Sequence, residues 1–303
     1  MKYILGSLLV LALSACNTKD TSSGSSPTAT PLSPASTVVQ AVPASAFASA
    51  SADSAPAVAS GLPAASDIRY AVTRVASNDV LNVREKPHVA SKKVYSFAPS
   101  VKGIRVTGQR QEKGGTPWVE VLFEGGTGWV NRTFLSEIKP GGGCNDPEVP
   151  ALIRAFMKAV ANSDGAALAA TISPLSGLSF YPGERALRVS RAQAETIFTS
   201  NQVFNIGPGE GGPDITGTFK DLVTPSLRES ILTKGAQEKC GKVLTGNGTG
   251  TPPTLESFQS AAVVSFFYPG QEEANNWVSW IGSIEYVESK PYFSSLKLFT
   301  RGI

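Results

Sequence analysis

The segments Trp118-Val119-Glu120-Val121 and Gly128-Trp129-Val130 decide the fold of the first half of the chain. Both are rich in β-branched and aromatic residues, which is typical of short strands. Similar runs precede them, broken by glycine, proline or asparagine: Leu81-Asn82-Val83-Arg84, the pair Tyr95 and Phe97, and the pair Ile104 and Val106. About five short strands separated in this way predict a small β-barrel.

Several of these motifs together resemble the bacterial SH3 domain, SH3b or SH3_3. The resemblance is carried by Leu81-Asn82-Val83-Arg84 with Pro87, by Trp118-Val119-Glu120-Val121, and by Gly128-Trp129-Val130 with Leu135. The chain departs from the pattern in a glycine-rich, slightly long loop from Lys113 to Pro117. The resemblance implies an SH3-like barrel over residues 67–139, of a kind found in envelope proteins and wall hydrolases and associated with peptidoglycan peptides. Fold alone does not fix function.

Five residues of this segment are the candidate ligand contacts: Asn82, Arg84, Tyr95, Trp118 and Trp129. A domain of this size needs large aromatic side chains for its core, so packing is the default role of both tryptophans and lining a surface groove is the alternative. Arg84 suits a ligand carboxylate, and its alternative role is to hold the first long loop.

The N-terminus is typical of an exported lipoprotein. Lys2 precedes an apolar run of about ten residues, which is too short to span a membrane that needs about twenty. The run ends in Leu13-Ser14-Ala15-Cys16, which resembles the bacterial lipobox, so we expect residues 1–15 to be a signal peptide and Cys16 to be lipidated. Asn17, in place of the aspartate that signals inner-membrane retention, favours the outer membrane, facing the periplasm.

Residues 16–66 consist mainly of serine, threonine, alanine and proline. Such a composition cannot bury enough apolar surface to form a core, so we expect a disordered tether. About fifty residues of random coil reach roughly 40 Å.

Overall composition gives no sign of a nucleic-acid partner, because the formal net charge is only +3 over 303 residues. Once Cys16 is acylated, Cys144 and Cys240 remain as a pair in an oxidising compartment, and we expect them to form a disulfide, with two buried thiols as the alternative. No cysteine or histidine cluster suggests a metal or another cofactor.

After a glycine linker at residues 140–143, residues 144–303 are expected to form an α+β domain with helices first and a C-terminal antiparallel sheet. Asp146-Pro147 predicts the start of a helix, and Ser163 or Asp164 and the Ser190/Gln193 capping box predict two more. Predicted strands follow at 178–181, 262–268, 277–287 and 292–300, the last two as a hairpin. Ile284 and Tyr286 are expected on one face of this hairpin, Tyr292, Leu296 and Leu298 on one face of its second strand, and Glu285 and Lys297 on an opposite face open to water.

The order of these elements loosely resembles that of nuclear-transport-factor-2-like domains, whose interior often holds a small ligand. A closed apolar pocket lined by Phe266, Trp280 or Tyr292 would favour a ligand-binding module in the C-terminal half. The glycine-rich stretches 205–217 and 244–253 are expected to be loops without phosphate-binding spacing.

The sequence argues against catalysis. Its one histidine, His88, is expected on an exposed loop and serves no catalytic pair. Nothing in the spacing of the second domain's carboxylates, Glu184, Glu195, Asp214, Asp221, Glu272 and Glu273, selects two of them for glycosidic cleavage. We therefore expect a non-catalytic protein that is anchored in a membrane through Cys16 and binds peptidoglycan peptides. The alternatives are a C-terminal binding module or inhibitor of a wall enzyme, and a carboxylate-dependent wall hydrolase.

Overall fold

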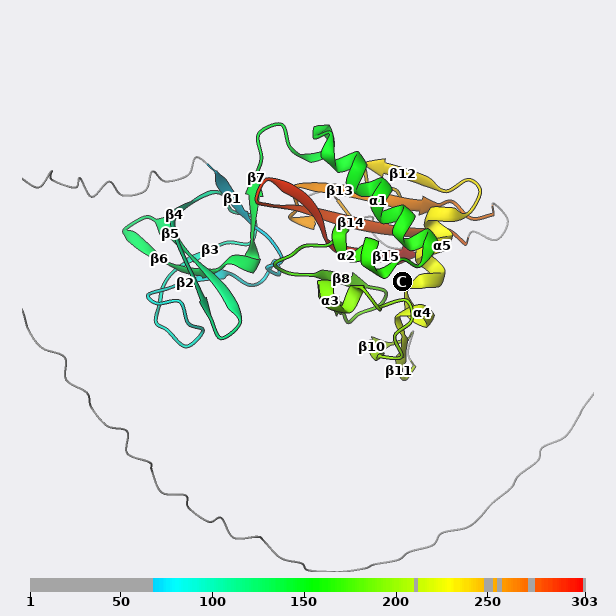
Figure 1. The fold of residues 1–303 in the computed structure, drawn as a ribbon, viewed down its shortest axis with the longest axis horizontal. Helices are drawn as coiled ribbons and strands as arrows, with labels where there is room; N and C mark the ends of the chain where they lie inside the picture. The colour runs from blue at the N-terminus through cyan, green and yellow to red at the C-terminus, as the bar shows by residue number, and fades with distance from the viewer. Residues whose placement is uncertain (1–67, 210–211, 248–252, 255–257, 272–275, 302–303) are drawn as a thin grey trace, which may run out of the picture. The chain divides into compact units, whose positions relative to one another are not determined.

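The computed structural model describes residues 68–209, 212–247, 253–254, 258–271 and 276–301. They all belong to one compact unit. The predicted signal peptide, the lipidation site Cys16, Asn17 and the tether lie outside the described residues. The fold is mostly β, with strands in sheets of seven, two and six strands (Figure 1).

The first sheet has the strand order β3-β2-β6-β5-β4-β1-β7, and all of its pairs are antiparallel. Its strands are β1 (Arg69–Val72), β2 (Leu81–Arg84), β3 (Lys93–Phe97), β4 (Lys102–Lys113), β5 (Thr116–Phe123), β6 (Gly126–Asn131) and β7 (Leu135–Ile138), with the short 3-10 helix η1 (Arg132–Phe134) before the last. No described pairing joins the edge strands β3 and β7, so this sheet is open, and the closed SH3-like barrel stays a prediction.

Tight glycine turns set the register of the first sheet. Gly114 and Gly115 both have positive φ, of 58° and 69°, and connect β4 to β5 in a two-residue hairpin. That geometry requires φ above zero at both central positions, which glycine adopts without strain. The loop is therefore shorter than the expected Lys113 to Pro117, because Lys113 pairs with Thr116 and Pro117 pairs with Glu112.

The two faces of the first sheet differ. Leu81, Val83, Val119, Val121 and Val130 belong to its buried apolar cluster. Trp118 and Trp129 alternate with these valines along β5 and β6, so their side chains lie on the opposite face. Both are buried, with 3% and 8% of their surface exposed, yet neither belongs to that apolar cluster.

The C-terminal sheet has the strand order β12-β13-β14-β15-β8-β9. Its strands are β8 (Leu178–Tyr181), β9 (Leu187–Val189), β12 (Gln237–Cys240), β13 (Ala262–Tyr268), β14 (Val278–Val287) and β15 (Lys290–Thr300). The expected hairpin is confirmed as β14–β15. The sheet is mixed rather than wholly antiparallel, because β8, which follows α1 and α2 in the chain, pairs parallel to β15.

The predicted helix starts are confirmed, although the third helix is short. The helices are α1 (Glu148–Asn162), α2 (Gly165–Thr171), α3 (Arg191–Ala194), α4 (Phe219–Leu222) and α5 (Thr224–Leu232), with the 3-10 helix η2 (Gly143–Asn145) before α1. Asp146 accepts from the Glu148 N–H, Asp164 caps α2, and Ser190 and Gln193 form the expected capping box of α3. The stretch 205–217 was expected to be a loop but contributes to the hairpin of β10 (Val203–Pro208) and β11 (Asp214–Thr218).

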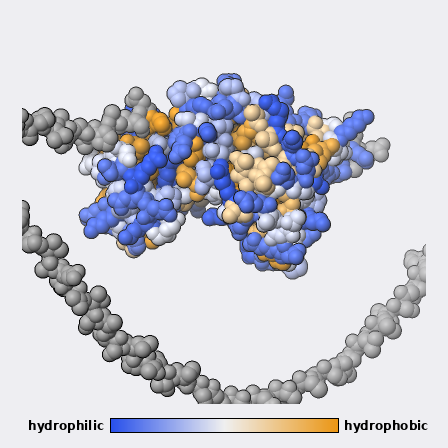
Figure 2. All heavy atoms as spheres, viewed as in Figure 1, coloured by the Kyte–Doolittle hydropathy of each residue, from blue (hydrophilic) through white to orange (hydrophobic). Residues whose placement is uncertain are grey.

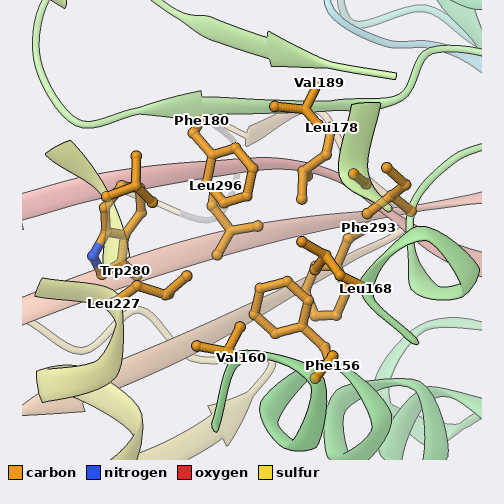
Figure 3. Close-up of a cluster of buried hydrophobic side chains, with 14 of the residues drawn as sticks. Phe156, Val160, Leu168, Leu178, Phe180, Val189, Leu227, Trp280, Phe293 and Leu296 are labelled. Carbon is orange, nitrogen blue, oxygen red and sulfur yellow. The ribbon is translucent and has the colours of Figure 1, made fainter. Parts of the chain in front are cut away.

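Helices α1 and α5 lie across one face of the long strands β13 to β15 (Figure 1). Figure 3 shows Phe156 and Val160 of α1 pointing at Phe293 and Leu296 of the sheet, with Trp280 beside Leu227 of α5. The rings of Phe156 and Phe293 have centroids 4.5 Å apart, and both side chains are fully buried. Large aromatic side chains therefore fill the space between the helices and the sheet.

A β-bulge in β15 places Tyr292 on a different face of the strand from the one expected. The register of β14 and β15 shifts between Ser283 and Ile284, so that Ile284 pairs with Phe293 while Ser283 pairs with Ser295. The additional residue, Ser294, reverses the alternation of β15. As a result Phe293 lies in the core, while Tyr292 pairs with Glu285 and is only half-buried.

Cys144 and Cys240 form the expected disulfide. It connects η2 to the edge strand β12, across a sequence separation of 96 residues. Both cysteines also pack against the apolar core of the C-terminal half.

A buried polar network joins the first sheet to the β14–β15 hairpin. Arg74, after β1, forms an ion pair with Glu285 of β14, and Ser176 donates to the same carboxylate at 3.1 Å. Glu285 is only 1% exposed, so the expectation that its face is open to water was wrong, whereas Lys297 is exposed as expected. Arg74 and Ser176 lie far from Glu285 in the sequence, and for this reason the strand pattern alone gave no sign of them.

The glycine stretch 140–143 is packed in the structure. Gly142 forms a turn with Lys139, and the Gly143 N–H donates to the hydroxyl of Tyr286 at 2.9 Å. A Cβ atom at Gly142 would lie 2.8 Å from the Lys139 carbonyl oxygen, so this position needs glycine.

Candidate functional site

Four of the five predicted ligand residues lie on one face of the first sheet. Arg84 pairs with Trp129, and Asn82 lies two residues before Arg84 on β2 and shares its face. Trp118 lies on the same face of β5 and pairs with Asn131 of β6. Tyr95 is separate, because it pairs with Val83 on the opposite face and stacks on Phe123 with ring centroids 4.9 Å apart.

A cavity of about 210 Å³ opens beside three of these four residues. We call it the Trp118 cavity, and it is lined by Arg74, Val75, Asp79, Val80, Leu81, Asn82, Arg84, Val89, Trp118, Asn131 and Phe134. Asn82, Arg84 and Trp118 were predicted from the sequence as ligand contacts. Trp129 and Tyr95 do not border it.

Two residues on this cavity carry buried hydrogen-bond donors that have no acceptor in the described part of the chain. These donors are Nε1 of Trp118 and Nη2 of Arg74. Buried polar groups in folded proteins are almost always hydrogen-bonded, so each such group calls for an explanation. The other terminal nitrogen of Arg74, Nη1, donates to Glu285 and, at 3.0 Å, to Ser176 Oγ.

The loop between β2 and β3 forms one wall of the Trp118 cavity and is fixed by local hydrogen bonds. Arg84 Nη1 donates to the carbonyl oxygen of Ser91 at 2.8 Å, and the Lys86 N–H donates to Ser91 Oγ at 2.9 Å. Arg84 therefore holds this loop, as one of its two expected roles required. It also borders the cavity and pairs with no carboxylate among the described residues.

The chemistry of the Trp118 cavity fits a short polar chain with apolar parts. Its lining includes the guanidinium-bearing side chains of Arg74 and Arg84 and the carboxylate of Asp79. Its apolar lining includes Val80, Val89 and Phe134. Mostly apolar walls with a few placed polar groups are typical of ligand sites.

Sequence reasoning missed Arg74, Asp79, Asn131 and Phe134. Arg74 has a left-handed backbone with φ of 58°, which no local sequence pattern indicates. Asn131 was predictable in principle, because Asn131-Arg132-Thr133 follows a strand and the Asn131 side chain caps the next turn by accepting from the Thr133 N–H at 3.0 Å.

A larger cavity, of about 550 Å³, lies elsewhere, beside Lys139, Glu137 and Tyr286. Two of its charged groups already have partners: Lys139 contacts Asp146 at 2.9 Å, and Glu137 contacts Arg132 at 3.2 Å. Burial, followed by the hydrogen bond to Asp146, raises the pKa of Tyr286 to about 12. None of the unpartnered buried atoms of the described chain belongs to the lining of this cavity, so it offers less to a polar ligand.

The three side chains whose pocket would favour a C-terminal binding module have packing partners in the structure. Phe266 stacks on Phe156 with centroids 5.6 Å apart, and Trp280 donates to Ser226 Oγ at 3.1 Å. Tyr292 lies beneath the guanidinium of Arg191 at 5.0 Å.

Two of the acidic residues considered for a hydrolase, Asp214 and Asp221, have structural partners. Asp214 accepts from Asn205 and Arg185, and Asp221 accepts from Thr218 in a capping box. These hydrogen bonds lower the pKa of both carboxyls, whereas a general acid needs a raised pKa. Glu272 and Glu273 lie outside the described residues. His88 lies on an exposed loop, as expected.

In comparisons with known proteins, no family model, no curated protein and no solved structure matches the chain. Within the described ranges, no helix has the length and apolar character needed to span a membrane.

Proposed function

We propose that this protein is a lipoprotein of the cell envelope that binds peptidoglycan peptides in the Trp118 cavity without cleaving them. The observation that carries the proposal is the cavity itself, whose lining brings together three of the predicted ligand contacts, Asn82, Arg84 and Trp118. The first sheet with its loops would then be a bacterial SH3-like module. The helices and the C-terminal sheet form the α+β part that supports it.

The anchor in this proposal is an acyl group on Cys16, which the lipobox-like sequence supports, most simply in the outer membrane and facing the periplasm. Residues 16–66 act as a tether between this anchor and the module. A second contact linked to an anchored first one has an effective concentration in roughly the millimolar range, so a weak affinity for the wall is sufficient.

The C-terminal half contributes to the proposed site through Arg74. Glu285 and Ser176 both hold this side chain, and both come from the C-terminal half. Residues 144–303 thus stabilise the binding surface, and their role in the proposal needs no separate ligand.

Sedimentation with insoluble peptidoglycan tests the proposal. The soluble chain of residues 17–303 is mixed with purified sacculi, and bound protein and released muropeptides are both measured. We expect binding without release, and about tenfold weaker binding for Arg84→Gln, because a charge-assisted hydrogen bond is lost.

Arg105→Gln is the matched control, because Arg105 is an exposed residue of the same sheet that does not line the Trp118 cavity. Failure of the native chain to sediment would refute the proposal. Release of muropeptides would favour the hydrolase instead. Equal losses in both variants would show that net charge, rather than the cavity, governs sedimentation.

Hydrophilic side chains cover most of the face shown in Figure 2, and apolar residues gather in separate patches rather than in one continuous surface. A polar ligand held in a small cavity suits this surface better than a large apolar docking partner does.

A further inference from the structure

Residues 84–93, which join β2 to β3, are strongly basic, and we call them the basic loop. Their cations are Arg84, Lys86, Lys92 and Lys93, and their one acid is Glu85. Four cations and one acid give this short segment a formal net charge of +3, as much as the whole chain carries over 303 residues. None of these side chains forms an ion pair within the described part of the chain. The basic loop therefore concentrates a positive charge that no acidic partner neutralises there.

The three lysines of the basic loop are exposed, and they lie around one compact tip. Backbone hydrogen bonds close the loop on itself: the Glu85 N–H donates to the Lys92 carbonyl oxygen at 2.9 Å, and the Ser91 N–H donates to the His88 carbonyl oxygen at 3.0 Å. Because the two ends of the loop are joined in this way, its charges act together on a partner that approaches the tip.

Two of these positive charges oppose each other across the strands. Arg84 of β2 pairs with Lys93 of β3, and like charges directly opposite one another destabilise a strand pair. Lysines on an edge strand such as β3 can prevent pairing with other chains, but this role gives no reason for a second cation on β2. Local arrangements that cost stability are typical of functional sites, and an anionic partner would offset this repulsion.

Apolar side chains are exposed beside the same charges. Val89, in the middle of the basic loop, is 64% exposed, and Val94 and Tyr95, which follow the loop on β3, are each 39% exposed. A surface that presents cations and apolar groups together fits the interface of an anionic membrane, where the apolar groups enter the headgroup region and the cations contact lipid phosphates. A soluble polyanion would match the charges alone.

We propose that the basic loop, together with Val94 and Tyr95, docks on a membrane surface that contains anionic phospholipids. Val89 enters the headgroup region, and the lysines around it contact lipid phosphates. This inference goes beyond the proposed wall contact, and none of the three lysines lines the Trp118 cavity. The proposed acyl group on Cys16 would keep the loop close to lipid, so a weak affinity of the loop itself is sufficient.

The first arm of the test measures co-sedimentation of residues 17–303 with lipid vesicles. One set of vesicles is phosphatidylcholine alone, and in the other about one third of the lipid is phosphatidylglycerol. We expect binding to the anionic vesicles only. The double variant Lys92→Gln/Lys93→Gln should bind them about tenfold to thirtyfold more weakly, because each lysine close to an anionic surface strengthens binding by about fivefold. Arg154→Gln/Lys158→Gln is the matched control, because it removes the same charge from two exposed positions of α1.

The second arm tests the apolar contact with two valines that are equally exposed. Val89→Ser should weaken binding to the anionic vesicles by about threefold to tenfold, because its apolar surface no longer leaves water on docking. Val203→Ser is the control, since Val203 is 65% exposed but lies on β10, away from the basic loop in the sequence. Equal binding by the native chain and Val89→Ser would overturn the proposed insertion of the loop.

Three further outcomes would overturn membrane docking by the basic loop. The first is that the native chain does not bind the anionic vesicles. The second is an equal loss in the two double variants, which would show that net charge rather than the loop governs binding. The third is that Lys92→Gln/Lys93→Gln weakens sedimentation with sacculi but leaves vesicle binding unchanged, which would assign the loop to an anionic wall polymer. Sacculi and vesicles are separate measurements, so the proposed wall contact and this inference can fail independently.

Discussion

Replacing Glu137 by glutamine should release the β14–β15 hairpin from the first sheet. The Glu137 side chain is 3% exposed and accepts three hydrogen bonds: from the Glu288 N–H at 3.0 Å, from the Ser289 N–H at 2.7 Å and from Arg132 at 3.2 Å. Glu288 and Ser289 both have positive φ and form the two-residue turn of the hairpin. Their N–H groups point away from the turn, where the Glu137 carboxylate holds them.

The size of the expected loss in the free energy of unfolding follows from the burial of the Glu137 carboxylate. Removing one member of a buried ion pair destabilises a protein by about 3–5 kcal/mol, because the remaining charge is left uncompensated. Arg132 also donates to the Leu135 carbonyl oxygen and lies over the Tyr70 ring at 4.9 Å, so part of its charge stays stabilised. We therefore expect a loss of about 3 kcal/mol for Glu137→Gln, at the lower end of that range. That is a large share of a typical stability of about 5–15 kcal/mol.

Urea unfolding of residues 17–303 measures this loss, with Glu148→Gln as the matched control. Glu148 forms an ion pair with Lys139 at 3.0 Å but is 52% exposed, so its loss should cost less than about 1 kcal/mol. Hydrogen exchange should show faster exchange at the amides of Glu288 and Ser289 in Glu137→Gln alone. Losses below about 1 kcal/mol in both variants, with unchanged exchange at these amides, would refute the view that Glu137 anchors the hairpin.

Three further predictions concern stability. Replacing Cys144 and Cys240 by serine should cost about 4.7 kcal/mol in urea unfolding, because the disulfide closes a loop with a sequence separation of 96 residues, and a loss below about 1 kcal/mol would contradict this. Burial alone would raise the pKa of Asp146, but hydrogen bonds from Lys139, from the Glu148 N–H and from Tyr286 lower it overall. The stabilisation by Asp146 should therefore be present above its ordinary pKa of about 4 and be lost as the pH falls through the lower native pKa, and Asp146→Asn should remove this part of the pH profile. Gly165→Ala would place a Cβ atom 2.1 Å from the Glu195 carbonyl oxygen and should cost at least about 1–3 kcal/mol, and a melting temperature equal to that of the native chain would contradict this.

Local signals in the sequence predicted local structure well. The capping box of Ser190 and Gln193 and the cap Asp164 mark helix starts because a side chain there bonds to backbone only a few residues away. The same kind of signal was available at Thr218 and Asp221, which form a capping box, and at Pro225 near the start of α5. Helices α4 and α5 were thus missed although their start signals are readable.

Features set by distant contacts could not be predicted in this way. Glu285 alternates along β14 as a residue of a water-facing strand would, but it is buried because Arg74 reaches it from 211 residues away. The bulge at Ser294 interrupts the strict alternation of β15 and places Phe293 in the core. No residue type beside Ser294 predicts a bulge.

The candidate site lies between these two cases. Asn82, Arg84 and Trp118 were predicted from strand motifs, since alternation fixes which residues share a face of neighbouring strands. Tyr95 was grouped with them but lies on the other face, because β3 pairs in a register that puts it opposite Val83. Register depends on the partner strand, and a one-residue difference moves a side chain to the opposite face.

The position of Arg74 explains why the two halves of the protein form one unit. An arginine left unpaired and mostly buried beside the Trp118 cavity would be costly, and Glu285 of the C-terminal half offsets that cost by pairing with Nη1. The same pair leaves Nη2 buried without a hydrogen-bond partner among the described residues. The C-terminal half thus fixes a guanidinium beside the Trp118 cavity, and a chain that lacked Glu285 and Ser176 would lose both side-chain partners of Arg74 Nη1.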